Sequence, residues 1–341
     1  MLQFTNSTSF EGTILPTPDP DGIDSLYTIV KGTFELNGDV KVAEEQIPVT
    51  MEDTYRDDPT ASSIEVPSDL CLVKPGTDVL LLGHAYAAAG RPTPHSIVSV
   101  SVGAVDKTIC VFGDRAWESG MLGLKISDAE LFESMPLMWE RAFGGTVETE
   151  ADPPELFAET RNPIGVGFSH KSIGKPQPGD PLPNFEDPDA LITSPSDKPT
   201  PAGLGPICPH WDPRRGFAGT YDETWEKKRM PYLPEDFDSR FFQVAPPDQI
   251  VEGYLTGGET VRIAGATPDN PLEFQIPTYD VSVTYAVGGS KETMKANLDT
   301  VLIEPDAHRL TLVWRSVLQC DKKTLEVTEI EATATGEPGN G

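Results

Sequence analysis

Short runs rich in β-branched and aromatic residues recur along the chain, and turn-forming residues separate them. Strong helical periodicity is scarce, whereas 33 prolines and 30 glycines supply many turns. This pattern is typical of strands. It predicts a mainly β fold of antiparallel, sandwich-like sheets with long ordered loops rich in proline and glycine. The predicted strands cover residues 27–34, 79–86, 97–105, 107–112, 260–264, 272–276, 281–287, 297–303 and 310–318.

Two segments carry the signal of a short helix. Residues 127–130 and 220–223 both begin with Ser or Thr and place Glu three positions later, which is a capping box. In the second segment acids come first and bases last, which suits the helix dipole, and Pro231 limits its end. Pro136 interrupts the first segment, so residues 137–143 fit a strand equally well. The sequence therefore predicts one or two short helices.

Ten prolines fall within residues 171–210. Such density excludes a regular helix or a central strand. The segment is either a linker or an ordered loop laid over the surface, and the apolar residues within 182–188 favour the ordered loop because they need burial. We expect an N-terminal β-rich part (1–145), a proline-rich loop region (146–210) and a C-terminal β-rich part (211–335). The first and third parts are expected to form one compact unit, and residues 336–341 a disordered tail.

The charge of the chain is strongly acidic. Twenty-six Lys and Arg stand against 54 Asp and Glu, which gives a net charge of −28. This charge disfavours nucleic-acid binding and favours either simple solubility or basic partners. The chain start has no signal-peptide pattern, and no apolar run is long enough to span a bilayer, so we expect no membrane insertion. The four cysteines form no CxxC pair, so we expect free thiols and a cytoplasmic location.

Residues for known catalytic or metal chemistry are not arranged in recognisable patterns. Cys208 and His210 could supply two zinc ligands, but no second pair follows, and no two histidines have metal-ligand spacing. A Gly-x-Ser-x-Gly elbow and a phosphate-binding loop are both missing from the sequence. We therefore predict no catalytic residue, no metal and no cofactor.

Residues 211–234 are unusually dense in turn formers, aromatic residues and cations. Trp225 and Arg229 stand at positions i and i+4 of the second predicted helix, which predicts a cation–π contact. Two interpretations stay open: these side chains lock the helix onto the body, or they form a recognition surface. We expect Arg214 and the acidic loops near it to be exposed. The residues considered for partner binding are Trp211, Arg214, Thr220, Asp222, Trp225, Arg229, Asp236 and Asp238.

A series of short motifs spans nearly the whole chain. They lie at residues 30–34, 74–79, 107–117, 139–145, 161–165, 182–188, 211–234, 236–249, 298–301 and 314–315. In number and order they resemble bacterial type VI secretion accessory proteins, a family catalogued as a domain of unknown function and encoded beside effectors and PAAR-like spike-tip domains. The segment at 211–234 is the most recognisable of these motifs.

The resemblance implies a cytoplasmic adaptor or chaperone that helps to load a toxic effector onto the secretion spike. Its expected partners are the effector, the PAAR-like domain and the spike protein, and no catalytic residue is carried over from the family. Two alternatives stay open. A hydrolase acting on glycans or modifying effectors would need a deep pocket with converging carboxylates. A carbohydrate- or small-ligand-binding β-sandwich would need aromatic side chains in a groove, with Trp211 or Trp225 facing solvent.

Overall fold

The largest sheet joins strands from both ends of the chain in a computed structural model that describes residues 2–121, 123–268, 271–321 and 323–337. Its strand order is β2-β3-β26-β25-β7-β20, with β4 paired to β3. The β25–β7 pair is parallel and the other pairs are antiparallel. The strands are β2 (Glu11–Pro18), β3 (Asp24–Asn37), β4 (Asp39–Val42), β7 (Gly76–Leu81), β20 (Ile250–Glu252), β25 (Asn297–Glu304) and β26 (Arg309–Gln319).

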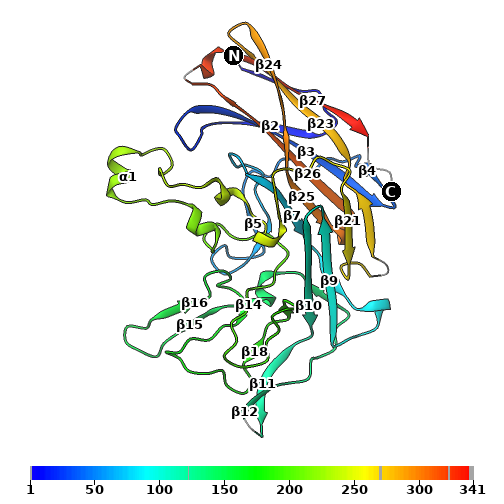
Figure 1. Cartoon of the computed structure of the whole chain (residues 1–341), viewed down its shortest axis with the longest axis vertical. Helices are drawn as coiled ribbons and strands as arrows, with labels where there is room; N and C mark the ends of the chain where they lie inside the picture. Colours follow the sequence, from blue (N-terminus) through cyan, green and yellow to red (C-terminus); the bar gives the residue numbers. More distant parts are fainter. Residues whose placement is uncertain (1, 122, 269–270, 322, 338–341) are drawn as a thin grey trace.

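Two further sheets pack around this one (Figure 1). One has the order β1-β27-β23-β24 and the other β19-β10-β9-β21-β22. The first contains β1 (Gln3–Asn6), β23 (Thr278–Val287), β24 (Ser290–Lys295) and β27 (Val327–Glu337). The second contains β9 (His95–Val102), β10 (Val105–Phe112), β19 (Phe185–Glu186), β21 (Thr260–Ala264) and β22 (Leu272–Gln275).

Shorter elements occupy the connections, many of them in the lower part of Figure 1. The short strands are β5 (Thr54–Tyr55), β6 (Ile64–Val66), β8 (His84–Tyr86), β11 (Arg115–Gly120), β12 (Gly123–Ile126), β13 (Ser134–Pro136), β14 (Phe143–Gly144), β15 (Thr146–Glu148), β16 (Leu156–Ala158), β17 (Val166–Gly167) and β18 (Pro181–Leu182). The helices are α1 (Glu223–Lys228) and the 3-10 turns η1 (Ala88–Gly90), η2 (Trp139–Arg141), η3 (Arg214–Phe217), η4 (Ser239–Phe242), η5 (Pro247–Gln249), η6 (Pro305–Ala307) and η7 (Thr324–Glu326).

The central strands are buried on both faces. In β3, ten consecutive residues from Ser25 to Phe34 are buried, and β7 is buried throughout. Side chains on one face of the large sheet, such as Leu26, pack against Tyr285 and Ile330 of the four-stranded sheet. Strand β10 instead alternates between buried and more exposed residues, as expected of a sheet with one face on the core. The predicted mainly β, antiparallel architecture is confirmed.

Each predicted strand overlaps an observed one, but two of the predicted ranges cross a turn. Residues 97–105 run from β9, which ends at Val102, into β10, which begins at Val105. Residues 79–86 do not form one strand, because β7 ends at Leu81 and β8 begins at His84. Gly83 between them has φ +141°, and the Asp306 carboxylate lies 2.9 Å from where a Cβ would stand. The chain therefore turns at a position suited to glycine. Among the longer strands, the predictions missed β24, whose residues are mostly polar, and β2, which contains two prolines at a sheet edge. They also missed β27, which covers eleven residues.

The helix predictions need two corrections. Residues 127–130 form no helix, because the Ser127 hydroxyl accepts a hydrogen bond from the Ala116 amide (3.0 Å) across the neighbouring strand. The second helix is present as α1, but its N-cap is Asp222, whose carboxylate accepts from the amides of Thr224 (2.9 Å) and Trp225 (2.8 Å). Thr220 instead binds Asp236 through its amide and its hydroxyl. Both segments have the residue spacing of a capping box. In the fold, however, Ser127 and Thr220 form hydrogen bonds with Ala116 and Asp236 instead of capping a helix.

The proline-rich segment is ordered, and its end enters the core rather than lying over the surface. Residues 201–208 are all buried. The indole of Trp139 donates to the Gly205 carbonyl (3.2 Å), and a Cβ on Gly203 would stand 2.6 Å from the same ring. At the C-terminus, Gly336 and Glu337 belong to β27, which corrects the prediction that the disordered tail begins at residue 336. The other residues of that tail, 338–341, lie outside the described residues.

All four cysteines have free thiols. Cys71, Cys208 and Cys320 are buried and Cys110 is half-buried. Burial raises the pKa of all four thiols, and raises the pKa of Cys208 to about 12. Because the thiolate is the reactive form, the three buried thiols are protected from modification in the folded protein, and half-buried Cys110 is the most accessible.

We expect a thiol-specific reagent at about pH 8 to modify no thiol other than Cys110 within minutes in the native protein, and all four in urea. Mass spectrometry counts the labels. The matched control is Cys110→Ser, which should take up no label in its native state. Fast native labelling of two or more cysteines would contradict the buried positions.

Candidate functional site

Residues 211–234, the segment dense in aromatic residues and cations, begin with two buried side chains, Trp211 and Arg214, which we call the base. Trp211 is fully buried, packs edge-on against Trp139 with ring centroids 6.1 Å apart, and donates its indole N–H to His210 Nε2 (2.9 Å). Arg214 is also buried, which corrects the expectation that it is exposed. Its Nη1 donates to the Ile207 carbonyl (2.5 Å) and its Nε to the Phe241 carbonyl (3.0 Å). Burial lowers the pKa of this guanidinium. These side chains hold neighbouring loops together.

From this base, residues 218–236 project as an arm that carries α1 (Figure 1). Trp225 donates its indole N–H to the Tyr232 carbonyl (2.8 Å) and packs edge-on against Tyr221 at 4.7 Å. The predicted cation–π contact of Arg229 with Trp225 is replaced by one with Tyr232, 6.0 Å from the ring centroid. The reason is that Arg229 donates to the carbonyls of Leu233 (2.8 Å) and Pro20, which draws it toward the body.

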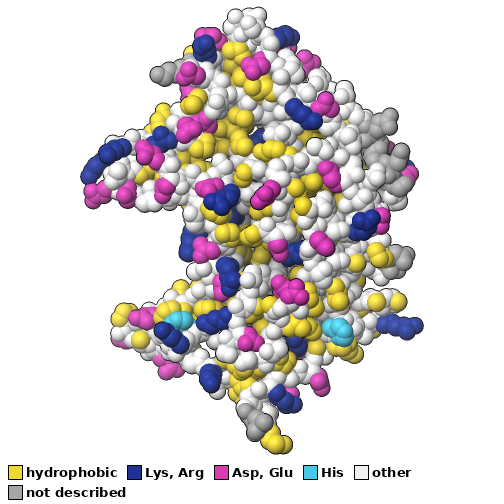
Figure 2. Space-filling view, viewed as in Figure 1, with side chains coloured by type: hydrophobic (Ala, Val, Ile, Leu, Met, Phe, Trp, Pro, Cys, Tyr) yellow, Lys and Arg dark blue, Asp and Glu magenta, His cyan; other side chains and the backbone are white. Residues whose placement is uncertain are grey.

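The arm leaves large apolar side chains in solvent. The exposed fractions are 53% for Tyr221, 60% for Met230 and 40% for Tyr232. Figure 2 shows the arm standing out from the body, with charges of both signs on it and a hollow beneath it. An ordered segment with exposed aromatic residues is a common form of protein-binding surface.

Five of the eight residues considered for partner binding come together on this arm. They line a cavity of about 330 Å³ and are Thr220, Asp222, Trp225, Arg229 and Asp236. Hydrogen bonds from Thr220 hold the pKa of the Asp236 carboxyl below its ordinary value. The other three lie elsewhere. Trp211 and Arg214 are in the base, and Asp238 caps η4 and pairs with Arg240 (2.5 Å). Since Trp211 is buried, the aromatic groove that a carbohydrate binder would need cannot include it.

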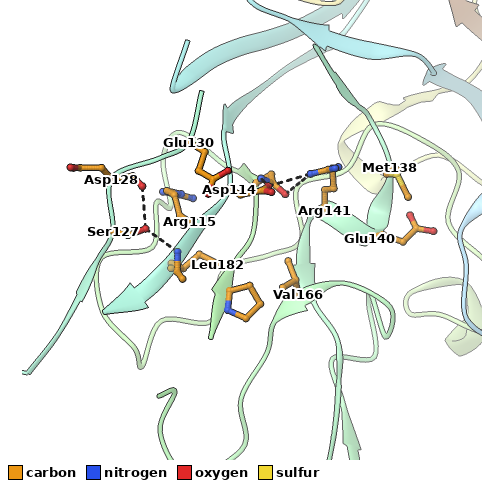
Figure 3. A pocket seen from close by; sticks show the side chains of 13 residues that line it. Asp114, Arg115, Ser127, Asp128, Glu130, Met138, Glu140, Arg141, Val166 and Leu182 are labelled. Carbon is orange, nitrogen blue, oxygen red and sulfur yellow. Dashed lines mark hydrogen bonds and ion pairs between the residues drawn. The ribbon is translucent and has the colours of Figure 1, made fainter. Parts of the chain in front are cut away.

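A larger pocket of about 720 Å³ lies beside β11 and β18, which are in the lower part of Figure 1, and Figure 3 shows it from close by. Five separate stretches of chain form it: the start of β11, the loop after β12, the turn η2, strand β17, and the residues around β18. The residues that line it are Asp114, Arg115, Ala116, Ser127, Asp128, Glu130, Met138, Glu140, Arg141, Val166, Pro181, Leu182 and Asn184.

Two arginines in the pocket are held by fixed partners. The Arg115 side chain is 8% exposed, pairs with the buried Glu186 and donates to the Pro183 carbonyl (2.8 Å). Its guanidinium also lies 3.8 Å above the Phe112 ring. Arg141 donates to the side-chain amide oxygen of Asn184 (Oδ1, 3.1 Å) and reaches Asp114 at 3.5 Å. These contacts fix one wall of the pocket, as the dashed lines in Figure 3 show for Arg141.

The pocket carboxylates fall into two groups. Glu140 accepts hydrogen bonds from the Ser63 amide (2.8 Å) and hydroxyl, and Asp114 accepts from the Asn184 amide nitrogen (2.9 Å). Asp128 and Glu130 are exposed at the rim. Among the contacts of the described residues, neither rim carboxylate has a side-chain hydrogen bond or ion pair. The hydrolase alternative, which needs converging carboxylates, stays a prediction.

The comparison with known protein families shows which family the chain belongs to. Residues 21–315 match the model of DUF2169, described as an uncharacterized protein conserved in bacteria. The protein belongs to this family. No curated protein matches the chain, and no solved structure matches it.

The DUF2169 match covers most of the chain, including every segment that lines the large pocket. Sequence reasoning named none of the pocket residues as a site, although several lie in the motifs at 107–117, 139–145 and 182–188. The sequence did contain a signal for the pocket, because charged residues recur inside those motifs, at Asp114, Arg115, Glu140, Arg141 and Glu186. What the sequence could not provide was the topology that places β11 beside β18.

Among the described residues, no helix is sufficiently long and apolar to cross a bilayer.

Proposed function

We propose that this DUF2169 protein is a non-enzymatic adaptor of bacterial type VI secretion. It binds an effector, or the PAAR-like region of an effector, and helps to load it onto the spike. The secretion system and the partner class come from the resemblance of the ordered motifs to accessory proteins of that system. The family match is consistent with a bacterial origin.

The observation that carries a binding role is the construction of the arm. Its base is fixed by buried Trp211 and Arg214, and its tip is tied to the loop before β3 through Arg229 and the Pro20 carbonyl. The exposed apolar side chains on the arm are therefore held in an ordered segment. A pre-ordered surface loses less conformational entropy when a partner binds.

The acidic charge supports a basic partner surface. With a net charge of −28, long-range attraction would speed encounter with a cationic partner and would weaken as salt rises. Transient binding of this kind suits an adaptor that must release its cargo at the spike.

The decisive experiment is co-expression with the products of neighbouring genes, followed by size-exclusion chromatography and a pull-down from the native host. We expect an effector or spike component to co-elute. The variant Tyr221→Ala with Met230→Ala should weaken that complex at least tenfold, because exposed aromatic residues dominate many interfaces.

The matched control is Met51→Ala with Leu325→Ala, which removes exposed apolar side chains outside the arm. It should leave the affinity unchanged. Recovery of no effector or spike component, or a gene deletion that leaves effector abundance and secretion unchanged, would argue against the adaptor role.

A further inference from the structure

Another cavity, of about 520 Å³, lies where Arg214 of the base meets the edge of the large sheet. The start of β7, the turns η3 and η5, the turn η4 with the residues after it, and strand β20 form its walls. Apolar groups cover much of these walls and come from Pro75, Phe217, Ala245, Pro247 and Ile250. Ligand sites in proteins commonly combine such an apolar lining with a few polar groups.

One wall holds a cation that has no carboxylate partner within ion-pair distance. Arg214 lines the cavity and is only 6% exposed. Its Nε and Nη1 donate to the carbonyls of Phe241 and Ile207, but its Nη2 has no acceptor among the described residues and is not sealed from solvent. Asp53 and Asp78 act on the guanidinium from farther away. A buried cation is normally paired, so an anionic group in the cavity would supply the missing partner.

Gln243 brings a second unused polar group to the same cavity. It is 5% exposed, and its Nε2 lies 3.3 Å from where a Cβ on Gly76 would stand. The Gln243 side chain forms no hydrogen bond with any described residue, and neither of its polar atoms is sealed from solvent. Buried amide groups in native proteins almost always have partners. The cavity therefore contains two nearly buried side chains with N–H donors to spare.

The contacts of Arg214 place it close to Gln243. The Phe241 carbonyl, which accepts from Arg214 Nε, lies two residues before Gln243. The other acceptor, Ile207, donates its amide to the carbonyl of Val244, one residue after Gln243 (2.7 Å). A single carboxylate has two acceptor oxygens, and this suits a guanidinium and an amide that are held so near each other.

The other charges of the lining are Arg240 and Glu252. Arg240 pairs with Asp238 (2.5 Å) and lies 4.3 Å from the centre of the Phe217 ring. Glu252 is exposed. Since Arg240 already has an anionic partner, Arg214 is the lining cation that a ligand can pair with.

We propose that this cavity binds a carboxylate joined to an apolar group. The carboxylate accepts from Arg214 Nη2 and Gln243 Nε2, and the apolar group lies against the apolar walls. Two kinds of ligand share this chemistry: a free aromatic or aliphatic acid, and the C-terminus of a peptide whose last residue is apolar. The assignment goes beyond the proposed adaptor function and does not depend on it.

The test uses the full chain and two probes, 3-phenylpropionate and the dipeptide N-acetyl-Gly-Phe, each compared with its amide. The amide keeps the apolar group and loses the charge. Isothermal titration calorimetry should show that each acid binds about tenfold or more tightly than its amide, because charge-assisted hydrogen bonds are the stronger kind. Tighter binding of the dipeptide acid than of 3-phenylpropionate would identify a peptide C-terminus as the ligand, and the reverse order or equal affinities a free acid.

The variant Gln243→Leu removes the amide and nearly keeps the side-chain volume. Acid binding should fall about threefold to tenfold, as expected for one lost hydrogen bond. The urea midpoint of unfolding should stay the same or rise, because the amide bonds to no described residue. The matched control is Gln275→Leu, at an exposed position of β22 outside the cavity, which should leave acid binding unchanged.

The carboxylate site would be overturned by any of three results: no binding of either acid, equal affinities of acid and amide, or the same affinity for Gln243→Leu as for the natural protein. An equal loss in Gln275→Leu would also overturn it, because the binding would then not depend on the cavity. None of these results bears on whether an effector or spike component co-elutes, so the adaptor role is tested separately.

Discussion

Replacement of Arg315 by alanine is expected to lower the free energy of unfolding by about 3–5 kcal/mol, because it leaves a buried carboxylate without its partner. Arg315 donates from Nε to Asp299 (2.7 Å), from Nη1 to the Cys71 carbonyl (3.0 Å) and from Nη2 to the Asp69 carbonyl (2.8 Å). The two charged side chains are 4% and 2% exposed. Water therefore cannot replace the lost partner without opening the core.

The loss should spread beyond one pair, since Asp299 also accepts from the Thr300 hydroxyl (2.8 Å). Lys74 donates in turn to the same hydroxyl oxygen (2.7 Å) and to Asp78 (2.9 Å). This buried network joins β26, β25 and β7, the strands that bring the two ends of the chain into one sheet.

Urea unfolding followed by tryptophan fluorescence measures the effect of Arg315→Ala. The matched control is Arg262→Ala, which breaks an exposed pair with Glu273 in which both side chains are 61% exposed. It should cost less than about 1 kcal/mol. A loss below about 1 kcal/mol for Arg315→Ala would mean that the network contributes little to stability.

Two of the longest strands, β3 and β26, could be predicted from the sequence because a buried strand is a continuous run of apolar residues. Strands β3 and β26 are runs of β-branched and aromatic residues with turn formers nearby, so composition alone finds them. Strand β24 contains Ser, Lys, Glu and Thr at an exposed sheet edge, and its neighbour β23 provides the pairing that its own composition does not signal. Strand β27 was missed as well, although Ile330, Ala332 and Ala334 alternate with polar residues in its sequence.

The side-chain partners could not be predicted from spacing, because spacing does not say which group is nearest in the fold. Arg214 looked like a surface cation, yet the carbonyls of Ile207 and Phe241 surround it. Thr220 had the position of a helix cap, but Asp236 lies within hydrogen-bond distance and Asp222 caps the helix. The large pocket was missed for the same reason, since its walls come from stretches of chain far apart in sequence.

The two tryptophans of the 211–234 segment have different roles: Trp211 supports the fold and Trp225 supports the binding surface. Alanine substitution should therefore lower stability most at Trp211 and partner affinity most at Trp225. Trp211→Ala is expected to cost about 3–5 kcal/mol of unfolding free energy, because it removes a fully buried indole packed on Trp139 and leaves a cavity. Trp225→Ala removes a half-buried ring on the arm and should cost about 1.5 kcal/mol or less.

Affinity for the recovered partner should follow the opposite order. In a binding assay at a temperature where both variants are folded, Trp211→Ala should keep most of its affinity, because the Arg214 and Arg229 contacts still hold the arm in place. Trp225→Ala should lose affinity, since Tyr221 packs against this ring and the Tyr232 carbonyl accepts its N–H. Urea unfolding and partner titration on the same two variants measure both quantities. If both substitutions lowered stability and affinity in parallel, the arm would be structural scaffold like its base, and the binding surface would have to lie elsewhere on the molecule.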